Sequence, residues 1–476
     1  MSHPLFQQPQ DAPALYCLFG EYEHSSHEKW HKVTHFYGEL HSKAEQIAFA
    51  FVDNGVRVGE RCAFVAPTNE TTLWMLLGCL RAGITAMPLS PRFPEAMVRS
   101  LVQQAGARYT ADSPSILPGR SHITELPYPP LSQAATILCS SGSTGIPKMF
   151  LHTVEQHYRS ALGAAGNIPF GQGDCWLASL PLYHVGGYAI MIRALLGGAA
   201  IAIPHYTSFA VERLAEALEN LPVTHCSFVS TQLYHALRFQ PALECLRRLK
   251  AIVLGGSAIP ESLIRQALDE GLKIYTSYGS TEMASQITTT KAPECEELRT
   301  SGSVLPYREL SISPKSEILV RGATLTQGKV TEQGIMPIVG DDGWYHTGDR
   351  GRLDDSERLI VLGRLDNMFI SGGENIYPEM IEAALLEHTD IVQAIVVPVA
   401  HEIYGSRPVA FLQREGNLPL EDAWILSIRT VLYEKLPRFA VPDVFAVFPQ
   451  NILASSLKPS RAELQSIAES LSLRKD

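Results

Sequence analysis

The sequence has no closely paired cysteines, although cysteine itself is not scarce. Its eight cysteines are spread between Cys17 and Cys295, and no two of them stand in a CxxC arrangement. Structural zinc sites and thioredoxin-like redox motifs both need such short spacings, so the sequence favours neither class. We therefore expect reduced, buried thiols of the kind found in cytoplasmic proteins.

Two kinds of apolar segment are also missing. The N-terminus has no basic region followed by an apolar run, which a secretory leader would need. The most apolar stretch, residues 188–204, is interrupted by Arg193 and by Gly197 and Gly198, so it is too short and broken for a membrane span. We expect a cytoplasmic protein without a membrane span, and in this stretch a buried helix followed by a strand.

Positive charge is scarcer than negative charge. The chain has 39 Lys and Arg residues against 49 Asp and Glu residues, which gives a formal net charge of -10. A protein that mainly binds nucleic acid needs a basic face, so the composition argues against this class. Small nucleotides are not excluded, because local loops bind phosphate even in an acidic protein. The composition also leaves a homodimer open.

The 476 residues are too many for one ordinary core, so we expect at least two domains. Between about residues 60 and 290, short apolar runs alternate with amphipathic segments, which predicts a layered α/β fold with largely parallel sheets. Ligands in such folds gather at the carboxyl ends of the strands. The expected strands are 61–67, 84–90, 197–205, 224–230, 249–256 and 273–279, and the expected helices are 71–83, 208–221 (with Ser208 as its N-cap) and 261–271.

The pattern changes near residue 340. Residues 340–377 are rich in Gly and Asp, with short strands between turns, which indicates a β-subdomain. A helix–strand–strand–helix–strand unit of about 110 residues follows, which is enough for a small α+β domain. We place the boundary between Arg364 and Asp366, which gives an N-terminal domain of residues 1–364, a hinge at 365–366 and a C-terminal domain of residues 367–476.

The first motif with chemical content is the segment 140–148, SSGSTGIPK, directly after an apolar run. Glycines allow tight turns, and the free N–H groups and hydroxyls of such a loop can wrap phosphate oxygens, with Lys148 adding positive charge. It is not a P-loop, because GxxxxGK[ST] is absent. Taken alone, the segment fits a polar hairpin turn better than a phosphate loop.

Three further motifs follow. In 278–282, YGSTE, the ring of Tyr278 can stack on a base and a carboxylate can bind Mg²⁺. In 347–349, TGD, together with Arg364, an acid and a base can bracket a ribose. The fourth is Lys458, near the C-terminus. Each has an ordinary alternative when taken alone: a capped turn, an Asp-Gly turn beside a surface arginine, and a solvated lysine.

In this order and at this spacing, the motifs resemble the adenylate-forming superfamily, which comprises acyl- and aryl-CoA synthetases, peptide-synthetase adenylation domains and luciferases. The resemblance runs from about Phe36 to Leu464, and the string GRLDNMFISGGENIYP adds to it. It implies an AMP-forming acid–thiol ligase that activates a carboxylate as its acyl-AMP, using ATP, Mg²⁺ and coenzyme A. It also implies that the small C-terminal domain is mobile.

The resemblance implies a role for each matching residue. The expected phosphate loop of ATP consists of Ser141, Ser143, Thr144 and Lys148. The expected contacts of adenine and ribose are Gly255, Gly256, Ser257, Tyr278, Gly279, Asp349 and Arg364. The expected phosphate and metal contacts are Thr144, Thr281 and Glu282. The remaining roles are Lys458 bridging the carboxylate and the α-phosphate, His184 gating the acyl and pantetheine channel, Gly372 and Gly373 entering the site for thioester formation, and Asp366 as the hinge.

More narrowly, the strings LASLPLYHVGGYAIMIRALL, SFVSTQLYHAL and YGSTEMAS resemble the ligases that join 2-succinylbenzoate to coenzyme A in menaquinone or phylloquinone synthesis. Such a substrate carries a second carboxylate, and burying that charge requires a cationic partner, for which Arg193 is the candidate. His184, Thr231 and Ser285 are the other expected substrate contacts. The alternatives left open are another aryl- or acyl-CoA synthetase, a stand-alone adenylation enzyme that loads a carrier protein, and a nucleotide-binding regulator.

Overall fold

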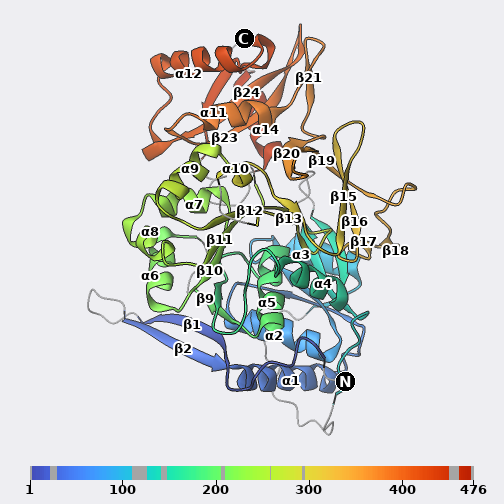
Figure 1. Cartoon of the computed structure of the whole chain (residues 1–476). Helices are drawn as coiled ribbons and strands as arrows, with labels where there is room; N and C mark the ends of the chain where they lie inside the picture. The colour runs from blue at the N-terminus through green and yellow to red at the C-terminus, as the bar shows by residue number, and fades with distance from the viewer. Residues whose placement is uncertain are drawn as a thin grey trace.

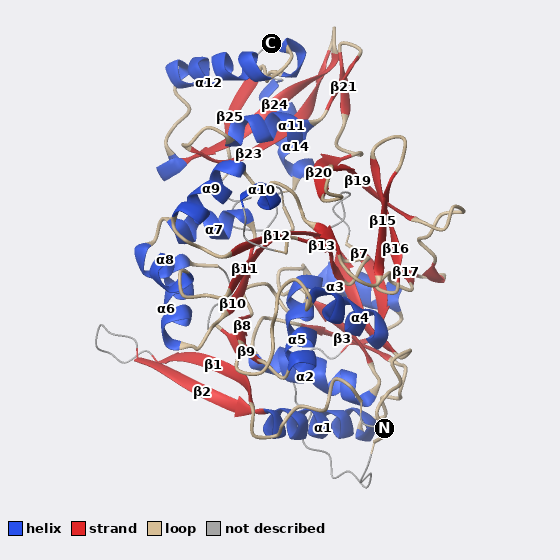
Figure 2. Ribbon diagram, viewed as in Figure 1, coloured by secondary structure: helices blue, strands red, loops and turns tan. Residues whose placement is uncertain are grey.

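The computed structural model describes residues 3–21, 29–109, 126–140, 147–204, 209–257, 259–291, 295–449 and 460–472. The chain forms a large N-terminal part and a smaller C-terminal part, which lie at opposite ends of the view in Figure 1. Colouring by secondary structure shows helices and sheets interleaved in the large part and a small α+β unit above it (Figure 2). The predicted layered α/β architecture with a β-subdomain and a small α+β domain is confirmed.

A nine-stranded sheet forms one half of the described large part, in the order β14-β13-β12-β11-β10-β8-β9-β1-β2. Its strands are β1 (Pro13–Glu21), β2 (Lys29–Phe36), β8 (Cys175–Leu177), β9 (Ala200–Ile203), β10 (His225–Phe228), β11 (Ala251–Leu254), β12 (Ile274–Ser280), β13 (Ser285–Thr289) and β14 (Ser303–Val304). The inner strands from β9 to β12 are parallel. Both β10 and β11 are buried along their whole length, as parallel strands covered on two faces should be.

Four helices pack with this sheet into one hydrophobic cluster. They are α6 (Val211–Asn220), α7 (Ser230–Leu237), α8 (Gln240–Leu246) and α9 (Glu261–Asp269). The prediction for α6 was wrong at its start: the helix begins at Val211 with Ala210 as its N-cap residue, and Ser208 lies outside the described residues. The sequence predicts a largely parallel sheet, but the end formed by β12, β13 and β14 is antiparallel. A tight turn joins β12 to β13, so β13 runs against β12, and β14 runs against β13.

A second, mixed sheet of seven strands has the order β18-β17-β7-β6-β4-β3-β5. Its strands are β3 (Arg61–Val65), β4 (Thr85–Leu89), β5 (Arg108–Tyr109), β6 (Ala134–Ser140), β7 (Lys148–Thr153), β17 (Gly328–Thr331) and β18 (Gly334–Met336). The helices of this region are α1 (Tyr37–Asp53), α2 (Glu70–Ala82), α3 (Glu95–Ala105), α4 (Val154–Ala164) and α5 (Val185–Gly197).

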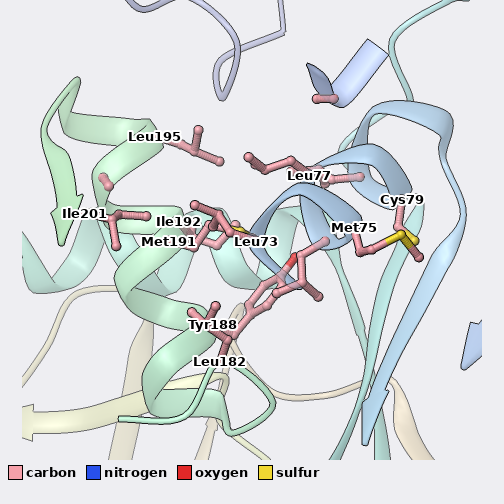
Figure 3. Packing of buried hydrophobic residues seen from close by; sticks show 14 of the residues in the cluster. Leu73, Met75, Leu77, Cys79, Leu182, Tyr188, Met191, Ile192, Leu195 and Ile201 are labelled. Carbon is pink, nitrogen blue, oxygen red and sulfur yellow. The ribbon is translucent and has the colours of Figure 1, made fainter. Parts of the chain in front are cut away.

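The large core lies where α2 and α5 meet. In Figure 3, Leu73 from α2 lies toward Met191 and Ile192 from α5, whereas Met75 lies beside Cys79. The apolar run at 188–204 thus forms a buried helix followed by the strand β9, as predicted. Dense packing holds α5 in one orientation, which fixes the direction of any polar side chain that it carries.

A four-stranded antiparallel sheet forms the β-subdomain, in the order β15-β16-β19-β20. Its strands are β15 (Arg308–Ile312), β16 (Glu317–Gly322), β19 (Tyr345–Leu353) and β20 (Leu359–Arg364), and the one-turn helix α10 (Cys295–Leu298) precedes it. A separate cluster that includes Met283, Ile287 and Val320 joins this sheet to the end of the first sheet.

The C-terminal part has its own core, which includes Ile381, Val396, Leu412 and Ile428. Its elements are β21 (Phe369–Ser371), β22 (Glu374–Ile376), α11 (Pro378–Leu386), β23 (Ile391–His401), β24 (Gly405–Arg414), the 3-10 turns η1 (Glu415–Asn417) and η2 (Arg438–Ala440), α12 (Asp422–Lys435), β25 (Val444–Val447) and α14 (Arg461–Ser472). The predicted helix–strand–strand–helix–strand order is confirmed. No helix among the described residues has both the length and the hydropathy needed to cross a bilayer.

Candidate functional site

The segment 278–282 forms the end of β12 and the start of the turn that leads to β13. The two strands approach each other closely here. An added Cβ on Gly279 would lie 2.2 Å from the carbonyl oxygen of Ser285 on the neighbouring strand. Real side chains do not tolerate this approach, so the motif needs glycine here. The turn brings Thr281 and Glu282 to the end of β12, which is the edge where the sequence predicts a ligand.

Three predicted nucleotide residues form a continuous chain of hydrogen bonds. Tyr278 donates from its hydroxyl to Asp349 Oδ2 at 2.6 Å, and Arg364 donates from Nη1 to Asp349 Oδ1 at 3.1 Å. Asp349 and Arg364 are direct partners across β19 and β20. Burial, with the Asp349 charge adding to it, raises the pKa of Tyr278 well above its ordinary value, so this group is a neutral donor.

The chain of contacts continues to the predicted hinge. Arg364 donates from Nε and Nη2 to the two carboxylate oxygens of Asp366, at 2.9 and 2.8 Å. The Arg364 guanidinium lowers the pKa of Asp366, and Asp366 together with Asp349 raises the pKa of Arg364. Residues predicted from two separate motifs therefore meet at the junction between the large and small parts, where β20 approaches α11 (Figure 1).

The segment 255–257 follows the neighbouring strand, β11. An added Cβ on Gly255 would lie 3.0 Å from the carbonyl oxygen of Ser277, so this segment runs directly beside the end of β12. The hydroxyls of Ser257 and Ser230 lie 3.2 Å apart, and Thr231 follows in the first turn of α7. The predicted adenine and substrate residues of these two segments are thus brought to one edge of the sheet.

Glu282 is held by Tyr345, a residue that lies outside the sequence motifs. Tyr345, on β19, donates from its hydroxyl to Glu282 Oε1 at 3.1 Å. Burial raises the pKa of Tyr345 above its ordinary range, so its hydroxyl stays protonated. One oriented carboxylate suits Mg²⁺, which is commonly bound through one or two carboxylates together with substrate phosphates. Among the described residues there is no cluster of three His, Cys, Asp or Glu side chains that would form an all-protein metal cage.

His184 and Arg193 are both positioned by the buried helix α5, His184 directly before its first residue and Arg193 within its C-terminal half. His184 is the N-cap residue, and its ring centroid lies 4.7 Å from that of Tyr183. The first turn of α5 is pressed against the preceding loop, because an added Cβ on Gly187 would lie 2.1 Å from the carbonyl oxygen of Pro181. The glycine of the HVGG string therefore has a packing reason, and it fixes where His184 stands.

Arg193 is buried, with 8% of its surface exposed, and carries a charge inside the core. Its Nη2 donates to Gln286 Oε1 at 2.5 Å, and its guanidinium carbon lies 5.3 Å from the centre of the Trp176 ring. Its Nε has no hydrogen-bond partner, and no carboxylate among the described residues forms an ion pair with it. Burial lowers the pKa of Arg193 to about 10.

The segment that precedes Gln286 has an unusual backbone. Ala284 and Ser285 have φ values of 54° and 114°, in a region that residues with side chains seldom adopt and that costs about 1–3 kcal/mol per residue. Ser285 is buried, and Ser160 on α4 donates from its hydroxyl to the carbonyl oxygen of Ala284 at 2.7 Å. The predicted substrate contact Ser285 therefore lies next to Arg193's partner.

The other predicted residues lie outside this set of hydrogen bonds or cannot be placed. Lys148 is exposed and opens β7, opposite Ser140, and its charge contributes to lowering the pKa of Asp366. Gly372 and Gly373 form the turn of the β21–β22 hairpin, where Gly372 N–H donates to the Tyr404 carbonyl, and no predicted site residue lies within 4 Å of a Cβ built on either. The predicted residues Ser141, Ser143, Thr144 and Lys458 lie outside the described residues.

Gln286, Arg308 and Tyr345 contact predicted site residues or their neighbours, yet sequence reasoning missed them. They belong to short strands of the β-rich region, and none stands in a recognisable motif. Only the position of Tyr345, two residues before the TGD string, offered a signal, because alternate residues of a strand share a face.

Comparison with known proteins places this geometry in a family. The AMP-binding enzyme family matches residues 5–125 and 109–328. The chain belongs to the AMP-binding enzyme family. The AMP-binding enzyme C-terminal domain matches residues 380–453.

Proteins similar to this chain include ligases that are named for 2-succinylbenzoate and coenzyme A. The 2-succinylbenzoate–CoA ligase of Escherichia coli (strain K12) is 34% identical over 439 residues, covering 90% of this chain and 92% of that protein. The o-succinylbenzoate CoA synthetase of Bacillus subtilis, in complex with the acyl-adenylate intermediate OSB-AMP, is 25% identical with a TM-score of 0.82 and 98% of each chain covered. In complex with ATP and a magnesium ion, the same enzyme gives a TM-score of 0.81, with 97% of this chain and 98% of that chain covered.

Proposed function

We propose that this chain joins 2-succinylbenzoate to coenzyme A through an acyl-adenylate, with release of pyrophosphate and AMP, as a step of menaquinone synthesis. One observation carries the choice of acid: Arg193 is buried and has no carboxylate partner among the described residues. A buried unpaired charge is costly, whereas an anionic ligand would offset that cost. A monocarboxylic acid that reacts at its carboxylate would leave Arg193 without a counter-ion.

In the first step, a carboxylate oxygen attacks the α-phosphorus of ATP, and the bond to pyrophosphate breaks. Two anions must approach each other, so the site has to supply positive charge. We propose that Lys458 bridges the two reacting groups, and that Ser141, Ser143, Thr144, Lys148 and Thr281 hold the phosphates. Glu282, oriented by Tyr345, is the proposed protein ligand of Mg²⁺ together with Thr144, and the ion would neutralise phosphate charge.

The nucleoside is held by the hydrogen-bonded chain at the junction. We propose that Asp349 accepts from the ribose hydroxyls while Tyr278 and Arg364 fix its carboxylate, since both already donate to it. Gly255, Gly256, Ser257 and Gly279 line the proposed base site at the ends of β11 and β12. The neutral hydroxyl of Tyr278 supports this role, because a phenolate would repel the carboxylate.

In the second step, the thiol of coenzyme A attacks the acyl-adenylate carbonyl, and AMP leaves. This step needs Lys458 removed from the site and a path for the pantetheine chain, which a rotation of the small domain provides. We propose residues 1–364 and 367–476 as the rigid units, Asp366 as the hinge, His184 as the gate, and Gly372 and Gly373 as the turn that enters the site. In the described arrangement no predicted site residue lies within 4 Å of a Cβ built on either glycine, so this role needs a second arrangement of the small domain.

The proposed substrate contacts are Arg193 for the second carboxylate, with His184, Thr231 and Ser285 around the acyl group. We further propose that the reaction takes place in the cytoplasm, where ATP and coenzyme A are available. A homodimer stays a prediction, which light scattering of the purified protein would test.

The proposed function is tested by a panel of acids. Pyrophosphate release is measured with 2-succinylbenzoate, benzoate, a medium-chain fatty acid and a long-chain fatty acid, and the thioester is identified by mass spectrometry with coenzyme A or a carrier protein as acceptor. We expect turnover with 2-succinylbenzoate and coenzyme A. Preferred turnover of a monocarboxylic acid would instead indicate another aryl- or acyl-CoA synthetase. Transfer to the carrier protein alone would indicate a stand-alone adenylation enzyme.

A further inference from the structure

A second buried guanidinium group is connected to the segment that carries the proposed substrate contact Ser285. Arg308, at the start of β15, is 6% exposed, and no carboxylate among the described residues forms an ion pair with it. Burial, with the Arg193 charge adding to it, lowers the pKa of Arg308 to about 9. Arg193 and Arg308 are thus two buried guanidinium groups without a described carboxylate to balance them.

Arg308 is held by oxygen atoms that carry no charge. Its Nη1 donates to the Pro306 carbonyl at 2.8 Å, and its Nη2 donates to the Ser160 carbonyl at 3.1 Å and to Ser160 Oγ at 2.9 Å. Its Nε has no hydrogen-bond partner. Space for this group is kept open by Gly163, because an added Cβ there would lie within clashing distance of Arg308 Nη1.

Ser160 connects Arg308 to the strained backbone. The same hydroxyl that accepts from Arg308 donates to the Ala284 carbonyl, so Arg308 and α4 together hold Ala284 and Ser285 in the left-handed region. Strained backbone persists only where its surroundings impose it. The residue that follows this segment is Gln286, the second residue of β13.

Gln286 presents its oxygen, and not its amide nitrogen, to Arg193. Its Nε2 donates to Ser277 Oγ at 3.0 Å and to Thr289 Oγ1 at 2.9 Å, which leaves Oε1 for the guanidinium of Arg193. A neutral acceptor orients Arg193 without neutralising it. A glutamate at the same place would form an internal ion pair and remove the reason for Arg193 to bind an anion.

We propose that Gln286 and Arg308 are positioning residues for Arg193, and that together they keep the pocket's positive charge uncompensated so that it selects an acid with a second carboxylate. This inference rests on the proposed function and names what sets its specificity. Arg308 acts through Ser160 and the backbone at 284–285, and Gln286 acts directly on the guanidinium. The second carboxylate of the substrate supplies the missing negative charge.

The test compares 2-succinylbenzoate with 4-oxo-4-phenylbutanoate, the same acid without its ring carboxylate. The ratio of kcat/KM for the two acids does not depend on the fraction of folded enzyme, so a partly misfolded variant still gives a valid ratio. We expect Gln286→Glu to lower this ratio about tenfold or more, chiefly by raising KM for 2-succinylbenzoate. Gln46→Glu, which adds the same charge on the exposed face of α1, is the matched control and should leave the ratio unchanged.

Two substitutions of Arg308 separate charge from structure. Arg308→Gln removes the charge and most of the hydrogen bonds, whereas Arg308→Lys keeps the charge. We expect the ratio to fall in both, with Arg308→Lys retaining more of the wild-type selectivity. If both variants lose activity equally on the two acids, Arg308 is a structural residue alone and the inference is overturned.

The failure of this inference differs from the failure of the proposed function. A wild-type enzyme that selects 2-succinylbenzoate, with an unchanged ratio in Gln286→Glu, would contradict the inference and leave the proposed function standing. A wild-type enzyme that does not turn over 2-succinylbenzoate would reject both.

Discussion

Charged side chains in the site are oriented by hydrogen bonds to residues of other elements. Asp349 accepts from Tyr278 and Arg364, Glu282 accepts from Tyr345, and Arg193 donates to Gln286. Each of these charged groups thus has a partner that fixes its direction. This is the arrangement expected of a binding site that is organised before its ligand arrives.

The hydroxyl of Tyr278 offers a direct test at this scale. We expect Tyr278→Phe to raise KM for ATP by about three- to tenfold, because one hydrogen bond to a carboxylate is lost, with little change in KM for the acid. Tyr275→Phe, on the same strand, is the matched control, since the Tyr275 hydroxyl has no hydrogen-bond partner among the described residues. Equal effects of the two substitutions would contradict the role of Asp349 as an oriented ligand.

A buried histidine pair predicts how stability depends on pH. The rings of His152 and His157 lie 5.1 Å apart, and burial lowers the pKa of His152 to about 4 and that of His157 well below 6.5. The unfolded chain takes up these protons near pH 6.5 and the folded chain does not, so stability is present above this pH and declines as the pH falls towards 4.

The decline is expected to be shallower when one histidine is replaced. His157→Gln keeps a group that can hydrogen-bond to Thr136 and removes one titrating site, worth up to about 1.4 kcal/mol per pH unit in this window. Thermal unfolding midpoints measured between pH 7 and pH 4 check this. Parallel curves for the wild type and the variant would show that His157 does not set the acid limit.

At the scale of elements, the hairpin formed by β19 and β20 carries the proposed ribose site at one end and a partly exposed ion pair at the other. Arg364 contacts Asp349, Asp366 and the Thr347 carbonyl at once, which a planar guanidinium allows and a lysine ammonium does not. At the far end, Arg358 pairs with Asp354. The hairpin therefore provides its own control.

We expect Arg364→Lys to raise KM for ATP by about tenfold, because Asp349 loses a fixed partner and Asp366 is released. Arg358→Lys, on the same hairpin, should change KM for ATP little. The measurement is the ATP dependence of pyrophosphate release at saturating acid. A comparable increase in both variants would mean that loosening the hairpin, and not the ribose contact, is responsible.

The elements were more predictable from sequence than the contacts between them. The run at 188–204 and the alternation from 60 to 290 predicted α5, β9 and the strands β10 to β12, because hydrophobic period and chain length suffice for buried elements. Arg308 and Ser160 are 148 positions apart, and Arg193 and Gln286 are 93 apart. Such contacts depend on how the sheets and helices pack, and no local pattern contains that information.

At the scale of the whole molecule, polar contacts join the two parts among the described residues. Arg238, directly after α7, donates to Glu415 at 2.8 Å, and Ser262 on α9 donates to the Leu386 carbonyl at 3.2 Å. A cleft of about 440 Å³ runs between them, lined by Arg238, Gln266 and Asp390 among others. A polar and partly open contact of this kind would permit the proposed rotation of the small domain.

The ion pair at this contact should bias the domain arrangement by a small amount. We expect Glu415→Gln to slow acyl-adenylate formation relative to thioester formation by up to about fivefold, because half-exposed ion pairs contribute about 1 kcal/mol at most. The effect should vanish at high salt. Pyrophosphate release measures the rate of acyl-adenylate formation, and supplied acyl-AMP gives the rate of thioester formation. Glu434→Gln, at an exposed position of α12, is the control. A salt-independent effect would contradict the electrostatic explanation.

The fate of the carboxylate oxygen tests the central claim, which is that the acid attacks the α-phosphorus of ATP. 2-Succinylbenzoate labelled with ¹⁸O in its reacting carboxylate is turned over with ATP and coenzyme A, and the nucleotide product is analysed by mass spectrometry. The account predicts AMP that carries one labelled oxygen, because the thiol expels AMP together with the oxygen that attacked phosphorus. Label in inorganic phosphate beside ADP, or AMP without label, would contradict it.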